Sequence, residues 1–125
     1  MITKINPDAM IFRLMPERRA WKELNYENLK WNVERLTELL PKGCTFMAVV
    51  KADAYGHGAI PVSSYLNRIG IRAFAVATLQ EGVKLRKAGI QGEILIMGYT
   101  PPQDAYLLTA NDLIQTAVDC AHARA

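Results

Sequence analysis

The chain has 125 residues, of which 50% are hydrophobic and 22% are charged, and its formal net charge is +3. This length suits one domain of ordinary size, and the composition is that of a globular protein rather than a disordered one. No nucleic-acid partner is implied, because the only local basic cluster (Arg18, Arg19 and Lys22) is short and is interrupted by Ala20 and Trp21.

The remaining composition argues against a secreted or membrane-spanning protein. Cys44 and Cys120 lie far apart and form no CxxC pattern, so neither a zinc site nor a disulfide framework is expected. The longest clean apolar run, residues 73–79, falls well short of the roughly 18 residues that cross a bilayer. The first residues lack the apolar core of a signal peptide. We therefore expect a cytoplasmic location.

The N-terminal part predicts an extension, a strand and a helix. Residues 1–17 contain two prolines and no clear period, which is typical of an extension or linker. Residues 19–24 alternate polar and apolar side chains and predict a strand. Asn25 is a plausible N-cap for an amphipathic helix, which ends near Pro41 and Gly43.

From residue 45 onward, predicted strands and helices alternate with short connections. Such a pattern favours a parallel sheet with right-handed crossovers. The predicted strands are residues 45–50, 72–77, 93–97 and 113–118, and the predicted helices are residues 58–69, 79–88 and 101–110, with Asp119 as the N-cap of another.

One strand ends on a lysine that a glycine-rich turn follows at once. Residues 46–58 read Phe-Met-Ala-Val-Val-Lys-Ala-Asp-Ala-Tyr-Gly-His-Gly, with the lysine at position 51. A lysine that emerges from a buried strand can serve as a nucleophilic amine. The glycines allow a backbone to approach an anionic ligand, or begin a helix whose N-terminus attracts phosphate. An amine beside a phosphate site suggests pyridoxal phosphate, which is held as a lysine Schiff base.

Residues 49–58 closely resemble the cofactor-lysine signature of the alanine racemase family. The resemblance runs from about residue 18 to the C-terminus and includes residues 19–24, 75–78, 81–82, 85–90, 92–100 and 113–119. It implies an α/β fold, the N-terminal half of an eight-stranded (β/α) barrel, which in the family precedes a mainly β domain. We therefore interpret residues 18–125 as a truncated barrel domain and residues 1–17 as an extension.

The resemblance also implies roles for two residues. Lys51 would bind pyridoxal phosphate and act as the acid–base group on one face of the substrate α-carbon, which makes it the candidate catalytic residue. Tyr55 would hydrogen-bond the cofactor phosphate, the alternative being a half-buried aromatic that packs on the barrel. In the family, the base on the opposite face is a tyrosine from the second domain of the partner subunit of a homodimer, and no segment of this sequence matches it.

Three further residues near the lysine have plainer interpretations. Asp53 follows Lys51 by two positions, on the same strand face if the strand continues, and is interpreted as turn chemistry rather than as an acid catalyst. His57 stands between two glycines and favours a role at a helix start, because His122 is the only other histidine and no metal-ligand set is formed. Glu81 is interpreted as a first-turn helix carboxylate.

The resemblance predicts a racemase that converts L-alanine to D-alanine for peptidoglycan precursors. One alternative is the serine or alanine racemase domain of membrane-anchored glycopeptide-resistance proteins, which residues 92–100 and the N-terminal extension also resemble. Another is a single-domain pyridoxal-phosphate-binding protein without turnover, although that group lacks the sequence of residues 54–58. A third is an inactive fragment. The isolated chain is expected to be inactive, because it lacks the later phosphate-binding loops and the arginine that faces the pyridine nitrogen.

Overall fold

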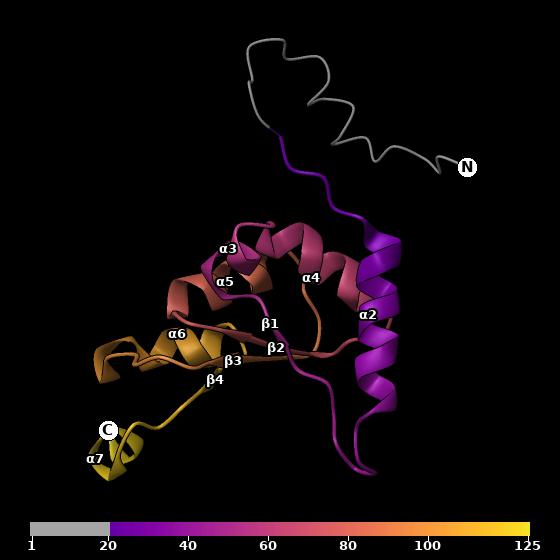
Figure 1. Cartoon of the computed structure of the whole chain (residues 1–125). Helices are drawn as coiled ribbons and strands as arrows, with labels where there is room; N and C mark the ends of the chain where they lie inside the picture. The colour runs from indigo at the N-terminus through magenta and orange to yellow at the C-terminus, as the bar shows by residue number, and fades with distance from the viewer. Residues whose placement is uncertain (1–20) are drawn as a thin grey trace.

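The computed structural model describes residues 21–125, and in that range the strands form one parallel four-stranded sheet (Figure 1). The sheet order follows the chain order, β1-β2-β3-β4, so each strand pairs with the next one along the chain. The strands are β1 (Ala48–Val49), β2 (Ala73–Val76), β3 (Glu93–Ile96) and β4 (Ile114–Gln115). Consecutive parallel strands joined by helices are the arrangement of the first half of a (β/α) barrel, which confirms the predicted fold class. The predicted extension, residues 1–17, lies outside the described residues.

The helices begin and end where the sequence places capping residues. Asn25 accepts a hydrogen bond from the N–H of Asn28 at 2.9 Å, and Asp119 accepts one from the N–H of His122 at 2.7 Å, so both predicted N-caps are confirmed. The helical segments are α2 (Tyr26–Glu38), α3 (Lys51–Tyr55), α4 (Ala59–Arg68), α5 (Leu79–Lys87), the 3₁₀ turn η1 (Pro102–Asp104), α6 (Ala105–Ala110) and α7 (Cys120–Arg124).

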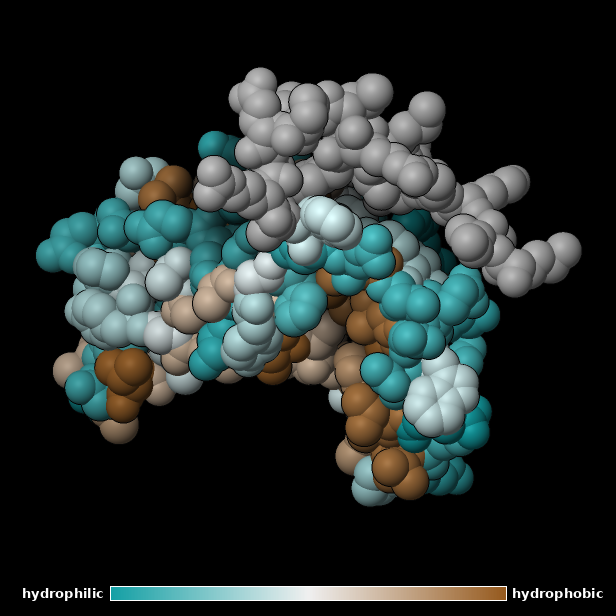
Figure 2. Space-filling view, turned by 45° about the horizontal axis from the view of Figure 1, so that its top comes forward, coloured by the Kyte–Doolittle hydropathy of each residue, from teal (hydrophilic) through white to brown (hydrophobic). Residues whose placement is uncertain are grey.

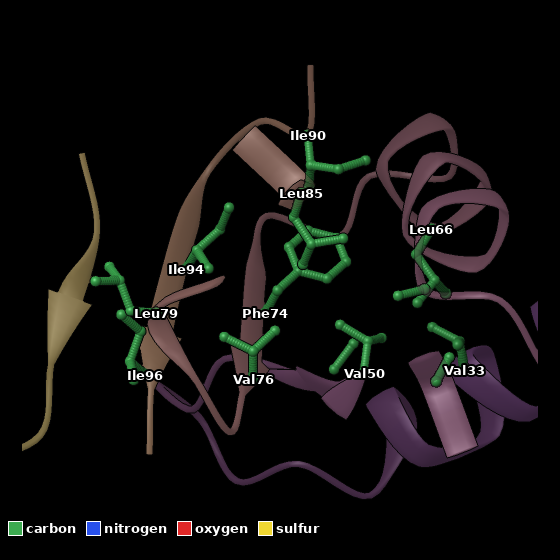
Figure 3. Close-up of a cluster of buried hydrophobic side chains, with 13 residues drawn as sticks. Val33, Val50, Leu66, Phe74, Val76, Leu79, Leu85, Ile90, Ile94 and Ile96 are labelled. Carbon is green, nitrogen blue, oxygen red and sulfur yellow. The ribbon is translucent and has the colours of Figure 1, made fainter. Parts of the chain in front are cut away.

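The hydrophobic core lies between the sheet and the helices that cover one of its faces. Figure 3 shows Phe74 and Ile94 pointing from neighbouring strands toward Leu85 of α5. All three side chains are fully buried, and burying a side chain of this kind contributes about 1.5–3 kcal/mol. Leu66 of α4 and Val33 of α2 extend the same cluster. The core therefore fixes the direction of the strands and, with it, the position of the loops at their ends.

The opposite face of the sheet carries a second apolar row that is more open to solvent. The register places Val49 beside Ala75, Ala75 beside Leu95, and Leu95 beside Ile114. Val49 and Ile114, at the two edges of the sheet, are 42% and 44% exposed. Figure 2 shows a hollow in the lower part of the view, with hydrophobic side chains along its edge. In a closed barrel, this row corresponds to side chains that point to the interior.

Three predicted strands are shorter or different in the structure. Of the strand predicted at residues 19–24, residues 21–24 have no regular secondary structure, and residues 19 and 20 lie outside the described part. The strands predicted at residues 45–50 and 113–118 each contract to two residues. The physical reason is that a strand requires a hydrogen-bonded neighbour, and the register pairs β1 only with Phe74 and Ala75.

Side-chain donors join the loops at the amino ends of the strands. The guanidinium of Arg86 donates to the carbonyl oxygens of Ile90, Gly92, Asn111 and Asp112 at distances of 2.6–3.1 Å. These carbonyls belong to the loops that lead into β3 and β4. A single side chain from the last turn of α5 thus holds in place the two loops that lead into β3 and β4.

Candidate active site

Lys51 lies directly beyond the carboxyl end of β1, as the sequence predicts. The last ladder bond of this strand runs from the N–H of Val50 to the carbonyl of Ala75 at 2.8 Å, and Lys51 follows as a partly buried residue. In (β/α) barrels, active sites are built at this end of the strands. The structure therefore brings Lys51 to the edge where reactive groups gather, while its chemical role stays a prediction.

The segment after Lys51 is a left-handed turn, which the sequence did not predict. Ala52, Asp53, Ala54 and Tyr55 all have positive φ angles, between 50° and 55°. This conformation costs L-residues roughly 1–2 kcal/mol each, so surrounding contacts must hold it. Extension does not continue past the lysine, and Asp53 therefore does not share a strand face with it. Strain of this kind typically collects at functional sites.

Asp53 and His57 hold the turn from its far end. The carboxylate of Asp53 accepts from the N–H of Ala59 at 2.8 Å, and its backbone carbonyl accepts from the N–H of Gly58 at 2.7 Å. Asp53 thus caps α4 and has the turn role that the sequence predicts. The ring Nδ1 of His57 lies 2.8 Å from the carbonyl of Ala54, so His57 contacts the turn itself rather than the helix start.

Two contacts from distant parts of the chain complete the support. The ammonium of Lys22 donates to the carbonyl of Gly56. The carboxylate of Glu81 accepts from the N–H of Ala52 at 2.7 Å, although the two residues are 29 positions apart. Sequence reasoning placed Glu81 only in the first turn of α5. That placement is correct, but it gave no signal of the contact between Glu81 and the lysine turn.

The residues that follow Lys51 include groups that suit the predicted cofactor, but the start of α4 is less suited to phosphate than the sequence indicates. Tyr55 is 60% exposed and offers an accessible hydroxyl, which does not match the alternative of a half-buried packing residue. An added Cβ at Gly56 would have no heavy atom within 4 Å, so there is open space on that side of the turn, although its N–H and carbonyl are bonded to Ala52 and Lys22. The start of α4 is less suited to phosphate, because Gly58 and Ala59 donate to Asp53 and Pro61 has no N–H.

Between residues 21 and 125, no three His, Cys, Asp or Glu side chains are grouped so as to hold a metal ion. None of the helices in that range has both the length and the apolar character that crossing a membrane requires. At the carboxyl end of β3, the rings of Tyr99 and His122 are 4.6 Å apart, and His122 Nε2 lies 2.9 Å from the carbonyl of Thr100. This pair joins α7 to the loop that follows β3.

Comparison with known proteins identifies relatives along most of the chain. An "Amino-acid racemase" of Enterococcus faecalis is 50% identical over 101 residues, which are 81% of this chain and 14% of that protein. The alanine racemase of Carboxydothermus hydrogenoformans is 46% identical over 99 residues, covering 79% of this chain and 27% of the relative. A "Serine/alanine racemase" of Enterococcus gallinarum is 41% identical over 108 residues, covering 86% of this chain and 16% of the relative.

Solved structures give the same result for the fold. The alanine racemase of Clostridium difficile 630 superposes with a TM-score of 0.81 and 34% identity, over 88% of this chain and 29% of that structure. A histidine racemase from Leuconostoc mesenteroides superposes with a TM-score of 0.79 and 27% identity, over 88% of this chain and 29% of that structure. This chain thus spans from 14% to 29% of the length of these relatives.

The family model of the alanine racemase N-terminal domain matches residues 24–125. The match includes the whole sheet, the lysine at the end of β1 and the turn that follows it. The sequence, the fold and the position of Lys51 therefore agree, and the chain belongs to the family of the alanine racemase N-terminal domain.

Proposed function

We propose that this chain supplies the cofactor-lysine part of a pyridoxal-phosphate-dependent amino-acid racemase, with alanine as the substrate and D-alanine for peptidoglycan as the product. The observation that carries the proposal is the place of Lys51, partly buried beyond the carboxyl end of β1 on a braced turn. The proposal includes residues 18–125 as part of one barrel domain, a cytoplasmic homodimer as the working form, and no nucleic-acid partner.

Lys51 and Tyr55 have separate tasks in this proposal. Lys51 binds the cofactor through its amine, and the same amine holds and moves a proton on one face of the substrate α-carbon. Tyr55, which is 60% exposed, donates a hydrogen bond from its hydroxyl to the cofactor phosphate. When bound, pyridoxal phosphate supplies an electron sink for the carbanion at the α-carbon. The braced backbone of the turn fixes the points from which the two side chains leave the chain.

A trapping experiment tests the binding part of the proposal. The purified chain is mixed with pyridoxal phosphate, and absorbance is recorded before and after borohydride reduction, followed by peptide mass spectrometry. We expect a reducible covalent adduct on Lys51 that is lost in Lys51→Ala. Lys87→Ala is the matched control, because Lys87 is an exposed lysine in the last turn of α5. An adduct spread evenly over several lysines would contradict the proposal.

A second experiment separates catalysis from cofactor binding. In deuterium oxide, one base on one face is enough to replace the α-proton of an amino acid by deuterium, even without inversion. Racemisation by the isolated chain is not expected, but exchange on one face needs only Lys51 and the bound cofactor, so we expect proton NMR to show such exchange in L-alanine, and Lys51→Ala to abolish it. An adduct without exchange supports a protein that binds the cofactor without turnover, or an inactive fragment.

Serine is the second candidate substrate. It is favoured by the 41% identity to a relative whose name includes serine. The solved relatives of this segment include both an alanine and a histidine racemase with nearly equal TM-scores, 0.81 and 0.79. The fold of this segment is thus compatible with different substrates. Running the exchange experiment with L-serine beside L-alanine ranks the two, and faster exchange in L-serine would replace alanine in the proposal.

A further inference from the structure

The carboxylate of Glu81 joins the lysine turn to the neighbouring strand. Its Oε1 accepts from the N–H of Ala52 at 2.7 Å, and its Oε2 accepts from the N–H groups of Ala77 and Thr78 at 2.8 and 3.2 Å. We propose that Glu81 is a positioning residue for Lys51, which sets the direction in which the lysine leaves the sheet. The inference rests on the proposed function of Lys51 and adds a residue that acts on it through the backbone.

The carboxylate of Glu81 bridges the chains of β1 and β2 where the next hydrogen bond of the parallel ladder is absent. The ladder between β1 and β2 ends with the bond from Val50 N–H to Ala75, and in a continued parallel ladder Ala77 would next donate to the carbonyl of Val50. That carbonyl instead accepts from the N–H of Ala54 at 2.9 Å, inside the left-handed turn. The two chains therefore separate at this point, and the Glu81 carboxylate spans the separation.

The contact acts on the peptide unit that contains the lysine carbonyl. The N–H of Ala52 and the carbonyl of Lys51 belong to one planar group, so holding the N–H fixes the orientation of the whole group. Ala52 is also the first residue of the turn with a positive φ, at 50°. A hydrogen bond to a carboxylate is stronger than one between neutral groups, which suits a contact that must hold strained backbone.

The distances distinguish this role from simple helix capping. A capping box requires Glu81 to bond only the N–H of its N-cap, Thr78, and that is the longest of the three bonds at 3.2 Å. The two shorter bonds go to Ala52 and Ala77, which lie outside α5. The capping box and the favourable helix dipole orient the carboxylate, and its shortest contact is made to the lysine turn.

Amide hydrogen exchange, followed by NMR in the cofactor-free chain, tests the contact. Ala52 is an exposed residue, so its N–H should exchange quickly unless Glu81 protects it. We expect slow exchange in the unsubstituted chain, and about tenfold or faster exchange in Glu81→Gln, whose amide group cannot accept from both sides. Fast exchange at Ala52 in the unsubstituted chain overturns the inference without any need for a variant.

Thr78→Ala is the matched control. It removes the hydroxyl that accepts from the N–H of Glu81 at 3.3 Å and weakens the start of α5, but it leaves the carboxylate in place. We expect protection of Ala52 to persist in this variant. If Thr78→Ala and Glu81→Gln expose Ala52 equally, helix capping alone explains the data and the inference fails.

Trapping of Lys51 then connects the contact to the lysine. At equal pyridoxal phosphate concentration, we expect Glu81→Gln to reduce the trapped fraction of Lys51 relative to Thr78→Ala and to the unsubstituted chain. Equal trapping in Glu81→Gln and in the unsubstituted chain overturns the positioning role while the proposed function stands. Absence of any Lys51 adduct in the unsubstituted chain overturns the proposed function instead, and the exchange data remain a separate result.

Discussion

The two ends of the sheet differ in the side chains that brace their loops most extensively. At the amino ends of the strands, side-chain donors reach backbone carbonyls, as Arg86 does toward the loops before β3 and β4. At the carboxyl ends, the carboxylates of Glu81 and Asp53 accept from backbone N–H groups, although Lys22 and Gln115 also donate to backbone carbonyls there. The difference follows from helix direction, because helices end near the first edge with free carbonyls and begin near the second with free N–H groups.

The two edges also differ in what their contacts hold. Arg86 ties together loops in which the single non-glycine residue with a positive φ is Asp112, at 49°, so most of its bonds contribute directly to stability. Glu81 and Asp53 hold a turn in which residues 52–55 all have positive φ, so part of their contribution offsets strain. The amino edge therefore stabilises the fold, and the carboxyl edge keeps the lysine turn in a costly conformation. Four predictions follow from this contrast, in decreasing order of expected effect.

Replacement of Arg86 by alanine should have the largest effect on stability. The guanidinium contacts four carbonyl oxygens and its side chain is only 20% exposed, so we expect the free energy of unfolding to fall by about 2–4 kcal/mol. Urea denaturation followed by circular dichroism measures the change. Lys87→Ala, one position further along α5, should cost less than about 0.5 kcal/mol. Equal losses of stability in Arg86→Ala and Lys87→Ala would show that the contacts of Arg86 at the amino edge do not stabilise the fold.

Substitution of Gly58 by alanine should be the most harmful single change within the lysine turn and its flanks. Gly58 has a φ of +97°, and an added Cβ would lie 2.8 Å from Cγ of Pro61. We expect a loss of about 1–3 kcal/mol in the free energy of unfolding. Gly56→Ala is the control, because Gly56 has a φ of +84° but open space around its Cβ position. A larger loss for Gly56→Ala than for Gly58→Ala would contradict this ranking.

The substitution Ala52→Gly should be tolerated, although glycine normally destabilises a helix. Because Ala52 has a φ of 50°, glycine relieves strain there, and we expect the free energy of unfolding to stay equal or to rise by up to about 1 kcal/mol. Lys84, an exposed residue of α5, gives the comparison. There, the glycine variant should be about 1 kcal/mol less stable than the alanine variant. Thermal melting of the unsubstituted chain, Ala52→Gly, Lys84→Gly and Lys84→Ala measures these differences. A destabilising Ala52→Gly would argue against the left-handed turn.

Asparagine at position 53 should have the smallest effect. Asparagine retains an oxygen that can accept from the N–H of Ala59, so the free energy of unfolding should change by less than about 0.5 kcal/mol, whereas Asp53→Ala should lose about 1 kcal/mol. Trapping of pyridoxal phosphate on Lys51 should be equal in Asp53→Asn and in the original chain. A loss of trapping at unchanged stability would give Asp53 a chemical role instead of a turn role.

Local pattern was enough to predict most of the fold. Apolar periodicity identified the helices, and Asn25 and Asp119 marked helix starts because short polar side chains satisfy free N–H groups. Strand lengths were overestimated, since the pairing that ends β1 and β4 depends on neighbouring strands. A six-residue apolar run predicts a buried extended segment but cannot indicate how many of its residues find a ladder partner.

The lysine turn marks the limit of sequence reasoning at the candidate site. The position of Lys51 could be predicted because it ends an apolar strand. The positive φ angles of Ala52 and Ala54 could not, because alanine normally avoids this conformation and gives no local signal of it. The contact that holds the turn comes from Glu81, which is 29 residues from Ala52. Such long-range support becomes visible only when both segments are placed in space.

The sheet order β1-β2-β3-β4 has a consequence for the growing polypeptide on the ribosome. Among the four strands of the described part, each pairs with the one made just before it, so the pairing within this sheet does not wait for a later segment. A nascent chain can therefore add one strand and one helix at a time to the edge already formed, as N-terminal segments emerge first. Lys51 and its turn lie beside β2, so their surroundings can form as soon as α5 and Glu81 leave the exit tunnel.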